Sequence, residues 1–151
     1  QTVRWRELVL ALGAVPRVIP IPGLTEHGLS FKSLADAIHL RNHVLQELEA
    51  ADAATDDEER ARRLTFVFVG AGYAGVEALA ELSDLADDAA RYYPRLKGVR
   101  RRWVLVDAAP KILPEIPSRL GDYAARWRSE HPLDEWLAAG SPHARPRTHA
   151  P

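Results

Sequence analysis

The feature that most constrains this chain is a glycine-rich turn between an apolar strand and a helix. The run Thr65–Val69 is rich in β-branched and aromatic residues, which predicts a buried strand that stops at a glycine. A Gly-x-Gly-x-x-Gly sequence follows at residues 70–75, and apolar residues at helical spacing continue to about Ala90. A strand that turns through glycines into a helix is the geometry that binds a dinucleotide pyrophosphate.

The residues of this turn have separate physical roles. Gly70 permits the tight turn, Gly72 lets the backbone approach a pyrophosphate, and Gly75 lets helix and strand pack closely. Ala71 and Tyr73 lie between them and lead into a helix N-terminus, which supplies unpaired N–H groups and a positive dipole end. We therefore assign all five residues to a cofactor site. A glycine turn that serves only packing, and a loop that binds S-adenosylmethionine, remain open as alternatives.

A second strand is predicted at Trp103–Asp107, where an apolar run ends in an acid. The order strand, helix, strand implies a right-handed crossover in a parallel sheet, and so an α/β fold of the Rossmann type. The Asp107 carboxylate can accept hydrogen bonds from the adenosine ribose and repels a 2′-phosphate, which favours NAD over NADP. The basic run Arg100–Arg102 could help to bind a 2′-phosphate, which keeps NADP open as the weaker alternative. A further alternative is that Asp107 serves only to form a turn.

Glu77 is the candidate catalytic residue. We expect it in the first helical turn after the glycines, where a carboxylate gains from the helix dipole and can face a bound nicotinamide. Stabilisation of the helix alone is an alternative of equal weight. His39 and His43 have metal-ligand spacing on one predicted helix, but no third ligand accompanies them, so we expect a solvated helix face and no metal.

The remaining chain divides into recognisable segments. The apolar run Leu8–Gly13 predicts a strand buried on both faces, and the prolines of Val15–Leu24 predict an extended connector. A cap-like Ser33 begins an amphipathic helix that we expect to reach about Ala51. The acidic stretch Asp52–Glu59 is predicted to be a solvated loop or a frayed helical turn.

The tail after about Ala125 is rich in Pro, His and Arg. It shows no sustained period beyond one helical turn near Leu133–Ala139, and we expect it to be irregular and mostly disordered. Its composition suggests a shifted reading frame or a foreign tail.

Composition excludes several classes of protein. The chain has 151 residues, enough for one domain but too few for two dinucleotide domains. Lys and Arg number 20 against 21 Asp and Glu, so no basic excess indicates nucleic-acid binding. The lack of cysteine excludes disulfides, cysteine zinc sites and thiol nucleophiles within the chain, and no apolar run approaches the ~20 residues of a membrane span. Since the chain lacks methionine, we expect position 1 to be a truncation point.

The segment Phe66–Leu82 resembles the NADH-binding segment of type II NADH dehydrogenases, the single-subunit NADH:quinone oxidoreductases. Further segments are similar to that family's second flavin motif, its passage into the nicotinamide domain, and its second nucleotide strand with the following turn. They are Leu8–Ala14, Ile21–Leu24 with Phe31–Ala37, and Val104–Asp107 with Ile112–Pro114. The resemblance runs in unbroken order from Val3 to Ala125.

This resemblance implies a peripheral membrane flavoprotein that passes hydride from NADH to FAD and electrons on to a quinone. It places the nicotinamide-facing acid on Glu77, the ribose-binding acid on Asp107, and flavin contacts on the residues Ala11, Leu12 and Gly13. The parent would be cytoplasmic or on the cytoplasmic face of the membrane, and the family leaves room for a homodimer.

The same comparison predicts three parts: a remnant of the FAD-binding domain at 1–32, a partial NAD(H)-binding domain at 33–125 and the irregular tail at 126–151. The family's first flavin motif and its quinone-contacting segment have no counterpart here, so we expect this chain alone to be inactive. A nucleotide-binding fragment without catalysis and another reductase that uses FAD and NAD(P)H are the two alternatives.

Overall fold

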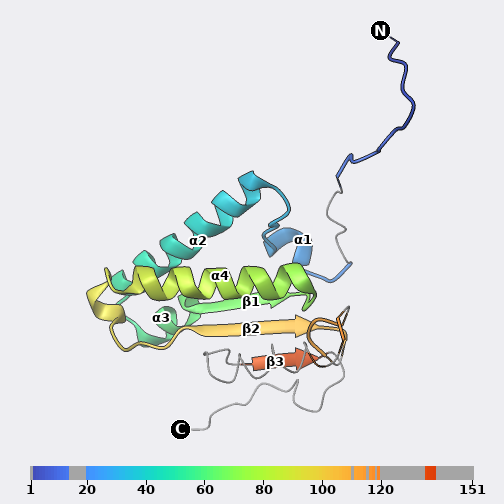
Figure 1. Ribbon diagram of the computed structural model, residues 1–151. Coiled ribbons are helices and arrows are strands. Elements are labelled where there is room, and N and C mark those ends of the chain that lie inside the picture. Colours follow the sequence, from blue (N-terminus) through green and yellow to red (C-terminus); the bar gives the residue numbers. More distant parts are fainter. Residues whose placement is uncertain are drawn as a thin grey trace. The chain divides into compact units, whose positions relative to one another are not determined.

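The computed structural model describes residues 2–13, 20–109, 111–114, 116, 117, 119 and 135–138. They belong to two compact units, Gln1–Leu40 and Arg41–Pro151, and one long helix crosses from the first to the second. Helices and strands are shown in Figure 1. In chain order they are α1 (Leu24–His27), α2 (Leu34–Ala53), α3 (Asp57–Arg63), β1 (Thr65–Val69), α4 (Tyr73–Ala90), the 3-10 helix η1 (Pro94–Leu96), β2 (Arg102–Asp107) and β3 (Glu135–Ala138).

In the first unit, the predicted strand at Leu8–Gly13 is not formed. These residues have no regular secondary structure, and apolar side chains among them are exposed, Val9 at 86% and Leu12 at 92%. A strand that is buried on both faces needs neighbouring strands to pair with and other elements to cover the two faces of the sheet. Among the described residues, the strands of this chain pair only with one another, and none pairs with this segment.

The predicted start of α2 is confirmed. The Ser33 hydroxyl accepts a hydrogen bond from Asp36 N at 3.1 Å, and the Asp36 carboxylate accepts one from Ser33 N at 2.8 Å. This reciprocal pair satisfies two N–H groups that the first helical turn leaves without intrahelical partners. In the second unit α2 buries Val44, Leu48 and Ala51, which share one helix face.

The acidic stretch is more ordered than the sequence suggests. Asp56 caps α3 by accepting a hydrogen bond from Glu59 N at 2.9 Å, and acids fill the first turn while arginines fill the last. This arrangement suits the helix dipole at both ends. Arg63 also bridges α3 to α2, with 2.7 Å to Glu59 and 3.0 Å to Glu47.

The predicted strand-helix-strand order is confirmed as a parallel sheet. Strands β1 and β2 pair from Thr65 opposite Arg102 to Val69 opposite Val106, and α4 is the crossover between them. The sheet has the order β1-β2-β3, and all its pairs are parallel. Figure 1 shows α4 running alongside β1 and β2. This is an α/β fold of the Rossmann type, as the sequence predicts.

The helical turn expected near Leu133–Ala139 is wrong, because Glu135–Ala138 form the strand β3. This strand pairs with β2 from Val104 to Asp107. A single helical turn is costly to nucleate, whereas the edge of β2 offers a row of N–H and C=O groups ready for pairing. The rest of the predicted irregular tail lies outside the described residues.

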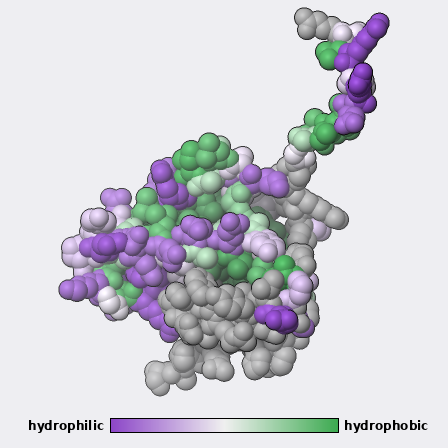
Figure 2. Space-filling view, viewed as in Figure 1, coloured by the Kyte–Doolittle hydropathy of each residue, from purple (hydrophilic) through white to green (hydrophobic). Residues whose placement is uncertain are grey.

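The core of the second unit is built around Trp103 on β2. Its side chain is 1% exposed, and its ring stacks on that of Phe66 with centroids 4.6 Å apart and planes 20° apart. Phe68, on the same face of β1, contacts the same ring at 6.0 Å. Figure 2 shows that hydrophilic residues gather at the end of this unit where α3, η1 and the C-terminus of α4 lie.

Replacement of Trp103 by alanine should remove most of this core. Because it deletes a fully buried aromatic side chain and its stacking interaction with Phe66, Trp103→Ala should lower the free energy of unfolding by about 3–5 kcal/mol. Urea denaturation followed by circular dichroism measures the change. The matched control Val67→Thr changes a strand residue that is 59% exposed and should stay within about 0.5 kcal/mol of the native chain. Equal stability of both variants would contradict a core centred on Trp103.

The start of α2 should depend on pH through Asp36. Hydrogen bonds lower the pKa of this carboxyl below its usual 3.8, first from Ser33 and then from the N–H of Lys32 and the Ser30 hydroxyl. A lowered pKa stabilises the fold above the unfolded value, and this contribution is lost as the pH falls through the folded value. The amide signals of Lys32 and Ser33 should therefore stay constant above about pH 5 and shift only at lower pH. In Asp36→Asn the same signals should not titrate; titration in that variant would assign the effect to another group.

Candidate nucleotide-binding site

The glycine turn lies where β1 ends and α4 begins. Gly70 has a φ of 106°, a conformation that side chains other than glycine rarely adopt, and its N–H donates to the Val106 carbonyl at 2.8 Å. Gly72 is the N-cap of α4 and has an extended backbone. Gly75 is buried in the first turn of α4, against the Gly70 carbonyl. The turn is thus fixed to β2 on one side and to its own helix on the other.

Position 75 requires glycine because there is no room for a side chain, and not because of its backbone angle. A Cβ built there would overlap the Gly70 carbonyl oxygen and lie 3.0 Å from the Gly70 carbonyl carbon. Both atoms belong to the backbone, so they cannot move aside as a flexible side chain would. The geometry agrees with the close packing of helix and strand that the sequence predicts for this position.

Asp107, at the end of β2, contacts the glycine turn directly. One carboxylate oxygen accepts a hydrogen bond from Ala71 N at 2.5 Å, and the other accepts one from Ala109 N at 2.6 Å. The side chain is half-buried. Short bonds to a carboxylate are the stronger, charge-assisted kind. The structure therefore brings together two parts of the site that the sequence assigns separately.

The turn after β2 completes this arrangement through a residue that the sequence analysis did not assign to the site. Leu113 N donates to the Ala71 carbonyl at 2.8 Å, and Leu113 is buried together with Ile112. Leu113 has a φ of 51°, which is uncommon for a leucine. The apolar pair Ile112 and Leu113 after a strand was the only signal in the sequence. The hydrogen bond from Leu113 N to the Ala71 carbonyl depends on a turn that the local sequence does not specify.

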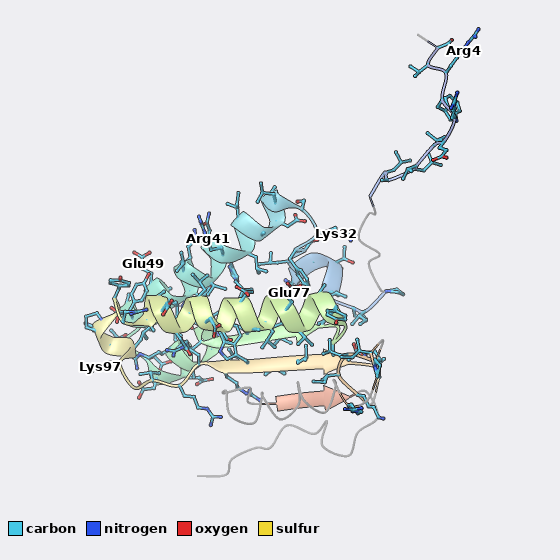
Figure 3. All side chains as sticks on the ribbon, in the orientation of Figure 1. Arg4, Lys32, Arg41, Glu49, Glu77 and Lys97 are labelled. Atoms are coloured by element: carbon cyan, nitrogen blue, oxygen red, sulfur yellow. The ribbon has the colours of Figure 1, made fainter. Side chains whose placement is uncertain are left out.

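Glu77 lies further along the helix than expected. Since α4 begins at Tyr73 and has no acid in its first turn, Glu77 belongs to the second turn. Its side chain is exposed, and Figure 3 shows it on the N-terminal part of α4, at the opposite end from Lys97. The dipole effect falls off beyond the first turn, so the expected gain from the helix end is reduced. Tyr73, at the first position of α4, is 62% exposed.

The arginine run lies at the wrong end of β2 to meet a nucleotide at the glycine turn. Arg102 begins the strand and Asp107 ends it, a span of roughly 16 Å at ~3.3 Å per residue. Arg101 pairs instead with Asp87 near the end of α4, with 2.9 Å from its Nε. The geometry favours a structural role for Arg101, and the position of the run at the start of β2 weakens the NADP alternative.

The remaining candidates do not join this site. Ala11, Leu12 and Gly13 are exposed residues of the first unit, and their flavin role stays a prediction. His39 and His43 lie on α2, and among the described residues no group of three His, Asp or Glu side chains is placed to hold a metal ion. Within the same residues, no helix has the length and apolarity to cross a membrane.

The fold and the site define a unit of the Rossmann type, with a glycine turn and a strand-end acid in contact. The sequence profile of one family, described as pyridine nucleotide-disulphide oxidoreductase, matches residues 1–133. The chain belongs to this family.

Curated relatives narrow the comparison. The type II NADH:quinone oxidoreductases Ndh and NdhA of Mycobacterium tuberculosis are 35% and 38% identical over 122 and 123 residues, which are 80% and 81% of this chain. The mitochondrial external alternative NAD(P)H-ubiquinone oxidoreductase B2 of Arabidopsis thaliana is 38% identical over 140 residues, 91% of this chain. The chain spans only about a quarter of these relatives, 26%, 26% and 24%.

Solved structures agree on the fold. NDH2 from Plasmodium falciparum in complex with NADH has a TM-score of 0.73 and 22% identity, and the match covers 83% of this chain and 26% of the other. The same protein in complex with RYL-552 has a TM-score of 0.76. Identity at this level supports the fold alone.

The likeness to the family extends past the point where the sequence analysis ended it. The family profile continues to residue 133, and a match over 91% of a chain of 151 residues must include residues after Ala125. The match to the family therefore argues against a foreign tail that begins as early as residue 126.

Gly75→Ala tests the packing of the glycine turn. The added methyl group must displace backbone atoms of Gly70, so this variant should lose about 1–3 kcal/mol of unfolding free energy, although alanine is the better helix former by about 1 kcal/mol. Urea denaturation measures the loss. Gly98→Ala is the matched control, because Gly98 has a φ of 77° but open space around it. It should show only the cost of the backbone angle, about 1 kcal/mol. A Gly75→Ala variant as stable as the native chain would contradict the close contact.

Proposed function

We propose that this chain carries the NADH-binding part of a flavoprotein oxidoreductase that passes hydride from NADH to FAD and electrons on to a quinone. The observation that carries the proposal is the contact between Asp107 and the glycine turn at the carboxyl ends of β1 and β2. In open α/β sheets a dinucleotide binds outside the carboxyl ends of the strands. The names of the relatives, with NADH and quinone in them, supply the class of reaction.

The pyrophosphate would bind at the turn from Gly70 to Tyr73. There the N-terminus of α4 offers backbone N–H groups without intrahelical partners, and Gly72 has no side chain to keep a phosphate away. The long helix adds its positive dipole end to this attraction. These residues fit a pyrophosphate without any cationic side chain.

Asp107 would hold the adenosine ribose and select NADH over NADPH. Each carboxylate oxygen can accept more than one hydrogen bond, so the bonds to Ala71 and Ala109 leave acceptor positions for ribose hydroxyls. A 2′-phosphate at the same place would meet a carboxylate at close range. One relative carries NAD(P)H in its name, so the preference of this chain for NADH over NADPH has to be measured directly.

Glu77 would face the nicotinamide, and bound FAD would supply the hydride acceptor. Glu77 is exposed in the second turn of α4, shortly after the glycine turn, which supports a contact with the nicotinamide half of a bound dinucleotide. Ala11, Leu12 and Gly13 would contact the flavin, within a remnant of the FAD-binding domain at 1–32 that precedes the NAD(H)-binding domain at 33–125. A peripheral position on the cytoplasmic face of a membrane, a quinone partner and a homodimer belong to the same proposal.

The second candidate is a nucleotide-binding unit without catalysis. The observation that favours it is that the segment expected to contact the flavin, Leu8–Gly13, forms no strand and leaves Val9 and Leu12 exposed. Both candidates require NADH binding at the glycine turn, and only the first requires flavin.

NADH titration tests the binding itself. NADH should quench intrinsic protein fluorescence saturably, and NADPH should bind at least about tenfold more weakly, equal to ~1.4 kcal/mol. Gly72→Val should abolish the saturable signal, because its side chain would occupy the place of the pyrophosphate. The matched control Gly98→Ala, which precedes β2 and so lies far from the carboxyl ends of the strands, should keep it. NADH binding that survives Gly72→Val would overturn the site, and flavin bands near one equivalent in the purified chain would overturn the second candidate.

A further inference from the structure

We infer that Asp107 is a positioning residue for the glycine turn as well as a ribose ligand. Its carboxylate holds the Ala71 peptide in place before any nucleotide arrives. The contact spans 36 residues of sequence, from the end of β2 to the middle of the turn. The consequence for affinity rests on the proposed function, but the positioning role does not.

Both the N–H and the carbonyl of Ala71 are held by groups at or after the end of β2. Its N–H donates to one Asp107 oxygen at 2.5 Å, and its carbonyl accepts from Leu113 N at 2.8 Å. The second Asp107 oxygen accepts from Ala109 N at 2.6 Å, so the carboxylate also fixes the start of the turn that carries Leu113. One side chain therefore joins the glycine turn to the loop after β2, and the Leu113 N–H joins the same two segments.

Burial makes this arrangement strong. Ala71 has no exposed surface, and Leu113 is 8% exposed, so water competes poorly for these backbone groups. An N–H that loses its partner at a buried position costs its full desolvation, whereas a bond to a carboxylate is roughly twice as strong as a neutral one. Asp107 thus decides whether the Ala71 N–H is satisfied.

The length of the side chain matters in this role. A carboxylate that bonds Ala71 N and Ala109 N together must lie close to the end of β2, and aspartate places it there. Glutamate would carry the same charge one methylene further out, where it can still reach a ribose but cannot keep both short bonds in place. A ribose ligand alone does not require the shorter acid.

The positioning role reduces what a nucleotide must order on binding. A turn that is already held with its N–H groups at the helix N-terminus saves the cost of immobilising it at the moment of association. The ribose then binds to a carboxylate that is oriented by the protein. The same residue would link the two halves of the nucleotide site.

The experiment follows backbone amide signals of the full chain by NMR without any nucleotide. In Asp107→Ala the Ala71 and Ala109 amide protons should move upfield and exchange with solvent about tenfold faster or more, as expected for the loss of a charge-assisted bond. Asp107→Glu should resemble Asp107→Ala at Ala71. Asp107→Asn, which keeps the length and one acceptor oxygen, should show a smaller change. Asp88→Asn is the matched control, since Asp88 is an exposed acid of α4 that pairs with Arg91, and it should leave both amides unchanged.

Unchanged Ala71 and Ala109 amides in both Asp107→Ala and Asp107→Glu would overturn the inference and restrict Asp107 to ribose binding. If Asp107→Ala does not fold, Asp107→Asn and Asp107→Glu decide the same question. NADH titration of the same variants separates the two proposals. If the amides respond but the native chain does not bind NADH, the positioning role stands and the proposed function fails. If the native chain binds NADH and the amides do not respond, the proposed function stands and the positioning role fails.

Discussion

The parallel pairing of β1 with β2 is the constraint on which the rest of this structure depends. The register sets Thr65 opposite Arg102 and Val69 opposite Val106, so both strands finish at one edge of the sheet. Because each side chain has a fixed place on a pleated sheet, a slip of one residue would turn Trp103 out of the core. It would also carry Asp107 away from Ala71. The core and the site therefore depend on the same set of backbone hydrogen bonds.

The packing of the unit is uneven around this sheet. Phe66 and Trp103 stack in the core, while Val67 and Val69 on the other face of β1 are 59% and 45% exposed. Among the described strands, β1 has one neighbour, so its second edge is unpaired. An unpaired edge beside exposed valines favours association with other chains or segments.

Much of this could be predicted from the sequence, for local reasons. The bounds of β1 follow from its β-branched and aromatic residues, the start of α2 from the Ser33 and Asp36 pair, and the turn from its glycines. The predictions that failed concern segments whose structure depends on partners. The strand expected at Leu8–Gly13 has no neighbour among the described strands, and the residues of β3 take the conformation that the edge of β2 offers.

The sequence by itself determined that a strand, a glycine turn, a helix and an acid at the end of a second strand occur in this order. Each of these is specified by residues close together, through propensity, capping and glycine geometry. Only the tertiary structure decided that Asp107 reaches Ala71, that Leu113 closes on the same residue, and that Arg102 lies at the far end of β2. These contacts join residues far apart in sequence, so they depend on strand register and burial, which no local pattern encodes.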